Sequence, residues 1–186
     1  PICNLPKEVR STILDKFAEL LPIEYVLLDW IDKDWLDWKS LSGNPNAIHL
    51  LENNYKKINW ESLSGNLNAI HLLENNYDKI IWKKLSGNLN AIKLLEKRIE
   101  YEKTLTKEEY DDLHYYKKIN WSELSTNPNA IKLLEKRIEY EKTLTEEELD
   151  ELDNVDNPNK INWDELSANP NAIKILKKNK NKINWY

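Results

Sequence analysis

The sequence contains few of the residues from which active sites are usually built. It has one cysteine, three histidines, three glycines and no methionine among 186 residues. A single cysteine excludes an internal disulfide framework, and no Cys/His cluster has the spacing of a zinc site. The three glycines occupy one position of an internal repeat, so they cannot form a phosphate-binding loop. We therefore expect no metal site, no cofactor and no enzymatic activity.

Long apolar runs are also missing. No segment approaches the roughly 20 residues needed to span a membrane. The first 17 residues mix apolar and charged side chains at helical spacing, which is unlike a signal peptide. The net charge is -5, which does not favour nucleic acid as a partner, although Lys beside regularly spaced Trp leaves base stacking as a weaker alternative. We expect a protein that is neither secreted nor membrane-spanning, and nothing in the sequence specifies an oligomeric state.

Tryptophan is abundant, and its spacing reveals an internal repeat. Six of the eight Trp begin copies of the segment WKSLSGNPNAIHLLENNYKKIN, and successive copies start 22, 22, 39, 42 and 22 residues apart. A period in this range is typical of a solenoid, in which each unit packs on its neighbours. The chain thus divides into an N-terminal segment, 1–35, and a repeat region, 36–186, with insertions at 97–118 and 136–160. The Trp of the full units are Trp38, Trp60, Trp82, Trp121 and Trp163.

Two helices are predicted in each 22-residue unit. The first begins after an Asp or Asn that can act as N-cap, and it places Trp and the Leu three residues later on one face. Ile81 interrupts this cap in the third unit. The second helix is expected to begin at an Asn-Pro pair such as Asn44-Pro45, with Asn as N-cap and Pro at the first helical position. We interpret the Trp and Leu residues as core.

Glycine occupies the turn between the two helices in three units, at Gly43, Gly65 and Gly87. A Gly that follows a helix usually adopts the left-handed conformation. Thr126 and Ala168 occupy the same position in the last two full units. Either those units tolerate a strained turn, or the position is not left-handed.

The second Asn of the repeat motif, three residues after the turn position, recurs in every full unit. These side chains either line a binding groove or bond main-chain groups of the turn and of the adjacent unit, as Asn readily does. Its recurrence beside a small Ala favours the second, structural interpretation. The residues are Asn46, Asn68, Asn90, Asn129 and Asn171.

Each insertion is expected to lengthen the second helix of its unit and to add a further helix of two to three turns. Thr106 with Glu109 and Thr145 with Glu148 have the spacing of capping boxes. Insertions in solenoids often lie on the working face, and the alternative is a solvated helix pair with ordinary surface charge. We expect a protein partner to bind through aromatic, histidine and acidic residues of the insertions: Tyr101, Glu108, Tyr110, His114, Tyr115, Tyr140, Glu147, Asp150, Glu151 and Asp153.

The N-terminal segment differs from the repeats. Pro6 and the apolar residues that follow it predict an amphipathic helix to about Leu21, which Pro22 ends. We interpret this helix as a cap on the array. In the alternative, LPKEVRSTIL resembles the opening of an F-box, a segment that docks a ubiquitin-ligase adaptor, and the repeats would then be a substrate receptor.

The predicted fold is an all-α solenoid of short helix–turn–helix repeats with an N-terminal helical cap and two helical insertions. The alternative is a leucine-rich-repeat horseshoe, in which Ile-Asn-Trp would form a short strand. The Asn-Pro helix starts and the absence of an L-x-L core favour the helical fold.

The repeat itself resembles a known family. The stretch LLDWIDKDWLDWKSLSGNPNAIHLLENNYKKINW is similar to the Trp and NPNAI repeats found in proteins of giant DNA viruses, over roughly 27–186 apart from the insertions. The resemblance implies a viral protein of the host cytoplasm or the virion, and it brings no catalytic residue. We expect an interaction module for host or viral proteins, with a structural virion component as the alternative.

Overall fold

The computed structural model describes residues 27–152 and 159–185. The chain divides into two compact units, Pro1–Asp32 and Lys33–Tyr186. Within the first unit, the backbone N–H of Ile31 donates to the carbonyl of Leu28 at 3.0 Å and closes a turn. The predicted N-terminal helix and the F-box-like segment lie outside the described residues. Among the helices that are described, none combines the length and the apolar character needed to cross a membrane.

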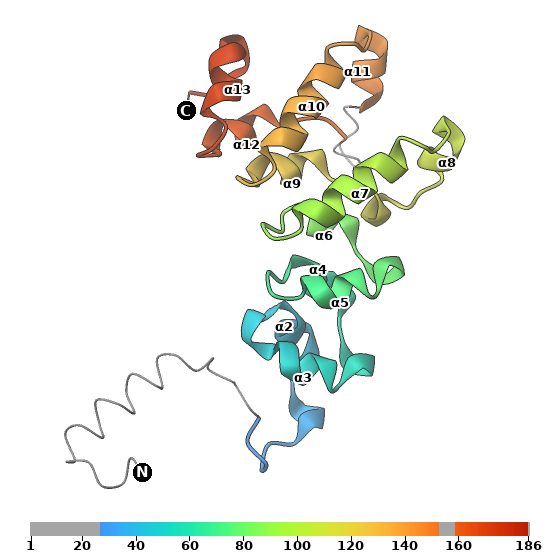
Figure 1. Ribbon diagram of the computed structural model, residues 1–186, viewed down its shortest axis with the longest axis vertical. Coiled ribbons are helices and arrows are strands. Elements are labelled where there is room, and N and C mark those ends of the chain that lie inside the picture. The colour runs from blue at the N-terminus through green and yellow to red at the C-terminus, as the bar shows by residue number, and fades with distance from the viewer. Residues whose placement is uncertain (1–26, 153–158, 186) are drawn as a thin grey trace, which may run out of the picture. The chain divides into compact units, whose positions relative to one another are not determined.

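The second unit is built from helices, and the described residues contain no strand. This confirms the all-α repeat fold and rules out the horseshoe over that range. Figure 1 shows the first helix of each repeat following the previous one in chain order, with the second helices beside them. The first helices are α2 (Trp38–Gly43), α4 (Trp60–Gly65), α6 (Trp82–Leu85), α9 (Trp121–Thr126) and α12 (Trp163–Ala168).

The second helices begin at the Ile of the Asn-Ala-Ile motif. They are α3 (Ile48–Glu52), α5 (Ile70–Glu74), α7 (Ile92–Glu102), α10 (Ile131–Glu141) and α13 (Ile173–Lys178). Short 3-10 turns complete the second unit: η2 (Lys33–Trp35), η3 (Pro45–Ala47), η4 (Tyr55–Lys57), η5 (Tyr77–Lys79), η6 (Tyr115–Lys117) and η7 (Lys180–Lys182).

The predicted helix starts are correct for the first helices and wrong by three residues for the second. Asn59 accepts the backbone N–H of Ser62 at 2.9 Å as an N-cap, whereas Ile81 provides no side-chain cap. Asn44 accepts the N–H of Asn46 at 2.9 Å and caps the 3-10 turn η3, so the α-helix α3 starts only at Ile48. Asn followed by Pro starts a tight turn as readily as an α-helix, because Asn bonds the backbone two residues on.

The turn glycines are not left-handed. No described residue, glycine or other, has a positive φ. A Cβ placed on Gly65 would meet no atom within 4 Å, and one on Gly87 would come no closer than 3.6 Å to Glu123. Thr126 and Ala168 therefore fit the same backbone without strain.

Trp and Leu of each first helix supply the core. Leu63, Leu85, Leu124 and Leu166 are completely buried, and so is the second Leu of the Leu-Leu pair in four units. Trp82 and Trp121 are buried, while the Trp of the other full units are half-buried and pack against the same core. Burying large apolar side chains at each interface stabilises an array in which each unit packs on its immediate neighbours.

A serine links each unit to the next. In the repeat that begins at Trp60, Ser64 donates its hydroxyl hydrogen to the carbonyl of Trp60 at 2.7 Å. The same oxygen accepts the backbone N–H of Ile81, before the next repeat, at 3.0 Å. The same Oγ acceptor recurs in each of the five full units: Ser42 for Asn59, Ser64 for Ile81, Ser86 for Asn120, Ser125 for Asn162 and Ser167 for Asn184. This serine ladder satisfies the N–H of the residue before each following repeat Trp, which in four of the five cases begins a first helix.

Two asparagine ladders run beside the serines. The amide of Asn88 donates to the carbonyls of Ser64 and Asn66 in the preceding unit, at 3.1 and 3.0 Å. The second Asn of the motif also donates its side-chain amide to a backbone carbonyl of the preceding unit, at 2.9 to 3.1 Å. The pairs are Asn68 with Pro45, Asn90 with Leu67, Asn129 with Leu89 and Asn171 with Pro128. These four side chains therefore bond the main chain of the neighbouring unit, the structural role that the sequence favoured.

The two insertions form helical arms. The first arm, residues 97–118, extends α7 and adds α8 (Lys107–Asp111); the second, residues 136–160, extends α10 and adds α11 (Glu146–Leu152). Both capping boxes are present, with Thr106 and Thr145 each bonded reciprocally to the Glu three residues on. At five residues, α8 is shorter than expected, because the chain turns back at Asp112 toward the next unit.

Candidate functional site: the cleft between the two arms

A buried ion pair anchors the first arm to the array. Arg98 and Glu102 lie one turn apart on α7, with Nε 3.0 Å from Oε1, and both side chains are more than 90% buried. Arg98 also donates to the carbonyl of Lys117, while Glu102 accepts the N–H of Ile119 at 3.1 Å. The pair thus holds the returning chain on both sides of Lys118. Burial raises the pKa of Glu102, against the opposing effect of Arg98.

The second arm repeats this anchor. Arg137 and Glu141 on α10 are 3.0 Å apart, Arg137 donates to the carbonyl of Asn159, and Glu141 accepts the N–H of Ile161 at 3.0 Å. The Arg137 guanidinium lies over the Trp121 ring, 4.8 Å from its centroid. Arg98 lies over Trp82 in the same way, at 5.1 Å. Both arms are therefore fixed at their bases by a charged group that also covers a repeat Trp.

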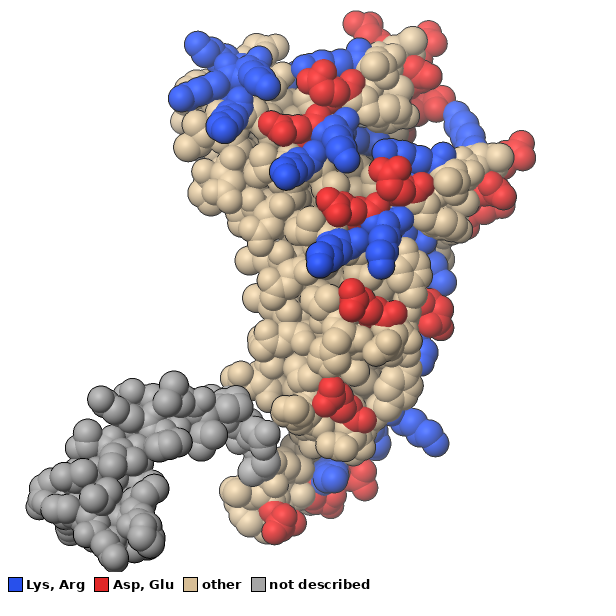
Figure 2. Space-filling model, viewed as in Figure 1, with Lys and Arg blue, Asp and Glu red and all other residues tan. Residues whose placement is uncertain are grey.

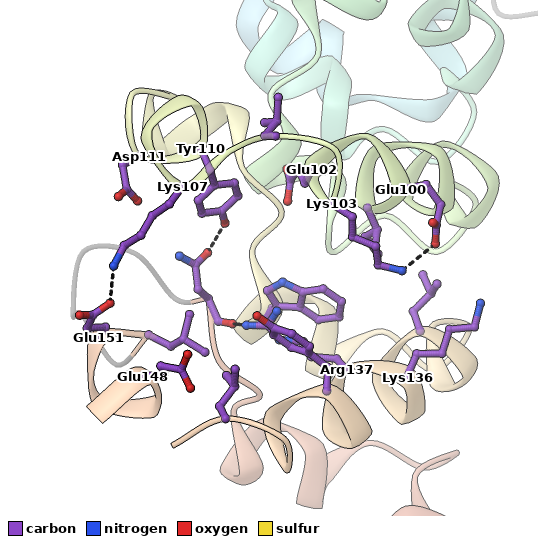
Figure 3. Close-up of a pocket in the computed structure, with 18 of the residues that line it drawn as sticks. Glu100, Glu102, Lys103, Lys107, Tyr110, Asp111, Lys136, Arg137, Glu148 and Glu151 are labelled. Atoms are coloured by element: carbon purple, nitrogen blue, oxygen red, sulfur yellow. Dashed lines mark hydrogen bonds and ion pairs between the residues drawn. The ribbon is translucent and has the colours of Figure 1, made fainter. Parts of the chain in front are cut away.

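A cleft of about 1070 Å³ lies between the two arms. Figure 3 shows side chains of α7 and α8 facing those of α10 and α11 across it. We name it the arm cleft. Six of the residues that line it are apolar: Trp121 and Leu133, which are buried, and Ile99, Leu105, Leu144 and Leu152, which are half-buried.

Two polar contacts between described residues join the arms across the cleft. Lys107 on α8 pairs with Glu151 on α11 at 2.9 Å, and both side chains are mostly exposed. Deeper in the cleft, the Tyr110 hydroxyl donates to Oδ1 of Asn159 at 2.8 Å (Figure 3). Burial, reinforced by the nearby Glu102 carboxylate, raises the pKa of Tyr110, so the hydroxyl stays a hydrogen-bond donor. The exposed pair contributes little, and the buried bond fixes the position of α8.

The arm tips are strongly acidic. Residues 107–112 and 146–152 carry nine Asp and Glu and one Lys. Figure 2 shows carboxylates gathered at the ends of the arms, while Lys or Arg residues alternate with Asp and Glu on the surface nearer the array. Three of the nine carboxylates have partners within the described part of the chain: Glu109 and Glu148 in capping boxes, and Glu151 with Lys107. The tips therefore carry a surplus of negative charge at one end of the cleft.

The structure brings together only some of the residues predicted to bind a partner. Tyr110, Tyr140 and Glu151 line the arm cleft. Glu108, on α8, and both Glu147 and Asp150, on α11, lie exposed on the arm tips beside it.

The remaining predicted residues are elsewhere. Tyr101, His114 and Tyr115 are exposed outside the cleft lining, with the His114 ring 4.9 Å from that of Tyr115. None of these three lines the arm cleft: Tyr101 lies on α7, and His114 and Tyr115 follow α8 as the chain returns to the next repeat. Asp153 lies outside the described residues.

Several important cleft residues carry no local sequence signal. Arg137 and Asn159 are brought together by the fold, and Leu144 lies in a turn and belongs to no motif. The one available signal was the duplication of Lys-Arg-Ile-Glu-Tyr-Glu in both insertions, which marks Arg98 and Arg137 as equivalent.

Comparisons with family models, curated proteins and solved structures give no match to this chain. Among the described residues, no three His, Cys, Asp or Glu side chains are grouped as metal ligands would be. The interpretation of the arm cleft therefore depends on its own geometry and charge.

Proposed function

We propose that the chain is a non-enzymatic repeat protein that binds a segment of another protein in the arm cleft. The repeats act as the scaffold, and the two insertions supply the binding surface. One observation carries the proposal: adjacent repeats bear insertions whose first halves are nearly identical, and the two arms enclose a cleft of about 1070 Å³ that six apolar residues help to line. A volume at the upper end of the range for ligand pockets suits a peptide segment better than a small metabolite.

The construction of the arms supports this proposal. The arms are anchored at their bases by buried Arg–Glu pairs, so the cleft exists before a partner arrives. A preformed site loses less conformational entropy on binding than a flexible one does. The resemblance of the repeat to those of giant DNA viruses supports a partner among host or viral proteins, met in the host cytoplasm or in the virion.

Selection from a random peptide library displayed on phage tests the proposal. Leu144 lines the cleft and is half-buried, so Leu144→Trp should fill the cleft without disturbing the core. Peptides selected on the unmodified protein should lose binding to this variant. Leu67→Trp is the matched control, because Leu67 is 37% exposed and lies outside the cleft lining.

The proposal fails if no peptide is selected, or if the selected peptides bind the Leu144→Trp variant and the unmodified protein equally well. Far-ultraviolet circular dichroism of both variants must match that of the unmodified protein. If only Leu144→Trp fails to fold, the same binding test is made with Leu105→Trp. Leu105 is the equivalent residue of the first arm, and it is also half-buried in the cleft lining.

A further inference from the structure

We infer that the segment bound in the arm cleft is a cationic amphipathic helix, rich in Lys or Arg on one face and in large apolar residues on the other. This inference rests on the proposed function, and it adds the chemistry of the partner. Three features of the cleft support it: the charge of the arm tips, the helical walls and the difference between the two ends.

The carboxylates of the arm tips are mostly uncompensated. Of the nine in residues 107–112 and 146–152, six make no ion pair or side-chain hydrogen bond to any part of the chain that the structure describes. A concentration of like charge destabilises the free protein slightly and attracts ligands of opposite charge. The six are Glu108, Asp111, Asp112, Glu146, Glu147 and Asp150.

The walls of the cleft offer side chains rather than a backbone edge. Most of the lining residues belong to α7, α8, α10 and α11, whose internal backbone groups are already hydrogen-bonded within helices. A ligand strand would therefore find no row of free N–H and C=O groups to pair with. An amphipathic helix needs only an apolar groove for its anchors at positions i, i+3, i+4 and i+7. The cleft offers four half-buried apolar side chains for such anchors: Ile99, Leu105, Leu144 and Leu152.

The two ends of the cleft differ in charge. At the tip end, Asp111, Glu148 and Glu151 face one basic residue, Lys107. At the opposite end, Glu96 and Glu100 are balanced by Lys103 and Lys136, and Lys103 pairs with Glu100 at 2.9 Å. The cationic residues of the ligand should therefore concentrate toward the end that lies between the arm tips.

Two synthetic peptides of about 14 residues, long enough to form a short helix on binding, test the inference. Both carry Leu at positions i, i+3, i+4 and i+7, and the remaining positions are Lys in one peptide and Glu in the other. Fluorescence anisotropy should show binding of the Leu/Lys peptide, weakening between about 0.05 M and about 0.5 M salt as screening increases. The Leu/Glu peptide should bind at least roughly tenfold more weakly, because its charge repels the tips.

Charge reversal on the arms provides the matched variants. The triple variant Glu108→Lys/Glu147→Lys/Asp150→Lys alters exposed carboxylates that have no partner among the described residues. It should weaken binding of the Leu/Lys peptide roughly tenfold at low salt. The control is Glu61→Lys/Glu74→Lys/Asp78→Lys, which makes the same change in net charge at exposed residues outside the cleft. The control should change the affinity much less.

The outcomes separate the two proposals. Binding of both peptides with equal affinity, or equal losses in the arm and control variants, would overturn the cationic-helix inference. If library peptides are selected on the cleft and lost in Leu144→Trp but prove acidic or uncharged, the proposed function stands and this inference falls. If neither library nor synthetic peptides respond to Leu144→Trp, the proposed function itself is wrong. Binding of a short double-stranded DNA in place of the Leu/Lys peptide would also overturn the inference.

Discussion

Ser86 accepts the backbone N–H of Asn120 at 3.0 Å, although 34 positions and an entire arm separate the two residues in the sequence. In a plain unit, the equivalent bond joins Ser64 to Ile81 over 17 positions with the same length. The arm therefore leaves the contact between consecutive units unchanged. Both partners of the longer bond are buried, so neither has water as an alternative.

Replacing Ser86 by Ala should destabilise the protein by about 1 to 3 kcal/mol, because the buried Asn120 N–H loses its acceptor. The measurement is the free energy of unfolding in urea. Ser62→Ala is the control, since Ser62 is half-buried and its hydroxyl makes no hydrogen bond among the described residues. Equal effects of the two substitutions would show that the serine ladder contributes nothing specific.

Replacing Trp121 by Ala should destabilise the protein by about 3 to 5 kcal/mol, as a large-to-small change in the core. Trp121 is 6% exposed, whereas Trp35 is 88% exposed. Trp35→Ala should therefore change the free energy of unfolding by less than about 0.5 kcal/mol. A neutral Trp121→Ala would mean that this ring is accessible, and it would restore base stacking as a role for the repeat Trp.

Gly65→Ala should stabilise the protein by about 0.4 to 1 kcal/mol, because Ala restricts the unfolded chain and the helix end already has room for a Cβ. Thermal and urea unfolding would both report the gain. The reverse change, Ala168→Gly at the same repeat position, should cost a similar amount. A loss of stability in Gly65→Ala would indicate a left-handed backbone there.

Removing Arg137 should cost much more than removing Lys107. Arg137→Ala leaves the Glu141 carboxylate, which is 90% buried, without its partner, a change that typically costs about 3 to 5 kcal/mol. Lys107→Ala breaks only an exposed pair and should leave the urea midpoint unchanged within error. Comparable losses in the two variants would show that the arms depend on contacts at their tips as much as on their bases.

The pH dependence of stability should reveal the buried carboxyl of Glu102. Burial raises its pKa above the ordinary value of 4.5, so the folded protein binds this proton more tightly than the unfolded chain does. The stability that protonation contributes is present below pH 4.5 and is lost as the pH rises through the higher pKa of the folded state. The free energy of unfolding of the unmodified protein minus that of Glu102→Gln should therefore decrease as the pH rises from 4.5.

Glu139 gives the control of opposite sign. The Lys142 ammonium, which hydrogen-bonds Glu139, lowers the pKa of that carboxyl below 4.5. The stability that the ionised Glu139 contributes is present above pH 4.5 and is lost as the pH falls through the lower pKa of the folded state. The free energy of unfolding of the unmodified protein minus that of Glu139→Gln should therefore increase with rising pH. The same trend in both variants would contradict the assignment for Glu102.

Much of the fold could be predicted because its signals are local. The Asn before Trp60 caps a helix through a contact three residues on, and the spacing of Trp60 and Leu63 places both on one face. The start of the second helices was missed because Asn44-Pro45 begins a 3-10 turn before α3, and the two conformations share the same start signal. The serine ladder was missed because its bonds join different units.

The cleft could be predicted only in part. The duplication of the insertions indicated a working face, and Tyr110, Tyr140 and Glu151 do line the cleft. The contacts that define it join residues far apart in the sequence, such as Tyr110 and Asn159, which are 49 positions apart. No local pattern encodes such a pair, because its geometry depends on how neighbouring units stack.

The stacking of the units determines where the arms lie. The Ser and Asn ladders connect consecutive units with or without an arm between them. The junction after each second helix is therefore a site at which extra residues can be inserted without changing the contact between units. The separation of two arms on adjacent units is then set at their bases by the spacing of the repeats. Foreign helical hairpins grafted at the plain junction after Glu52 or after Glu74 should therefore stand beside one another at the same interval. The array would then be a scaffold in which the spacing of the repeats sets the distance between two inserted binding elements.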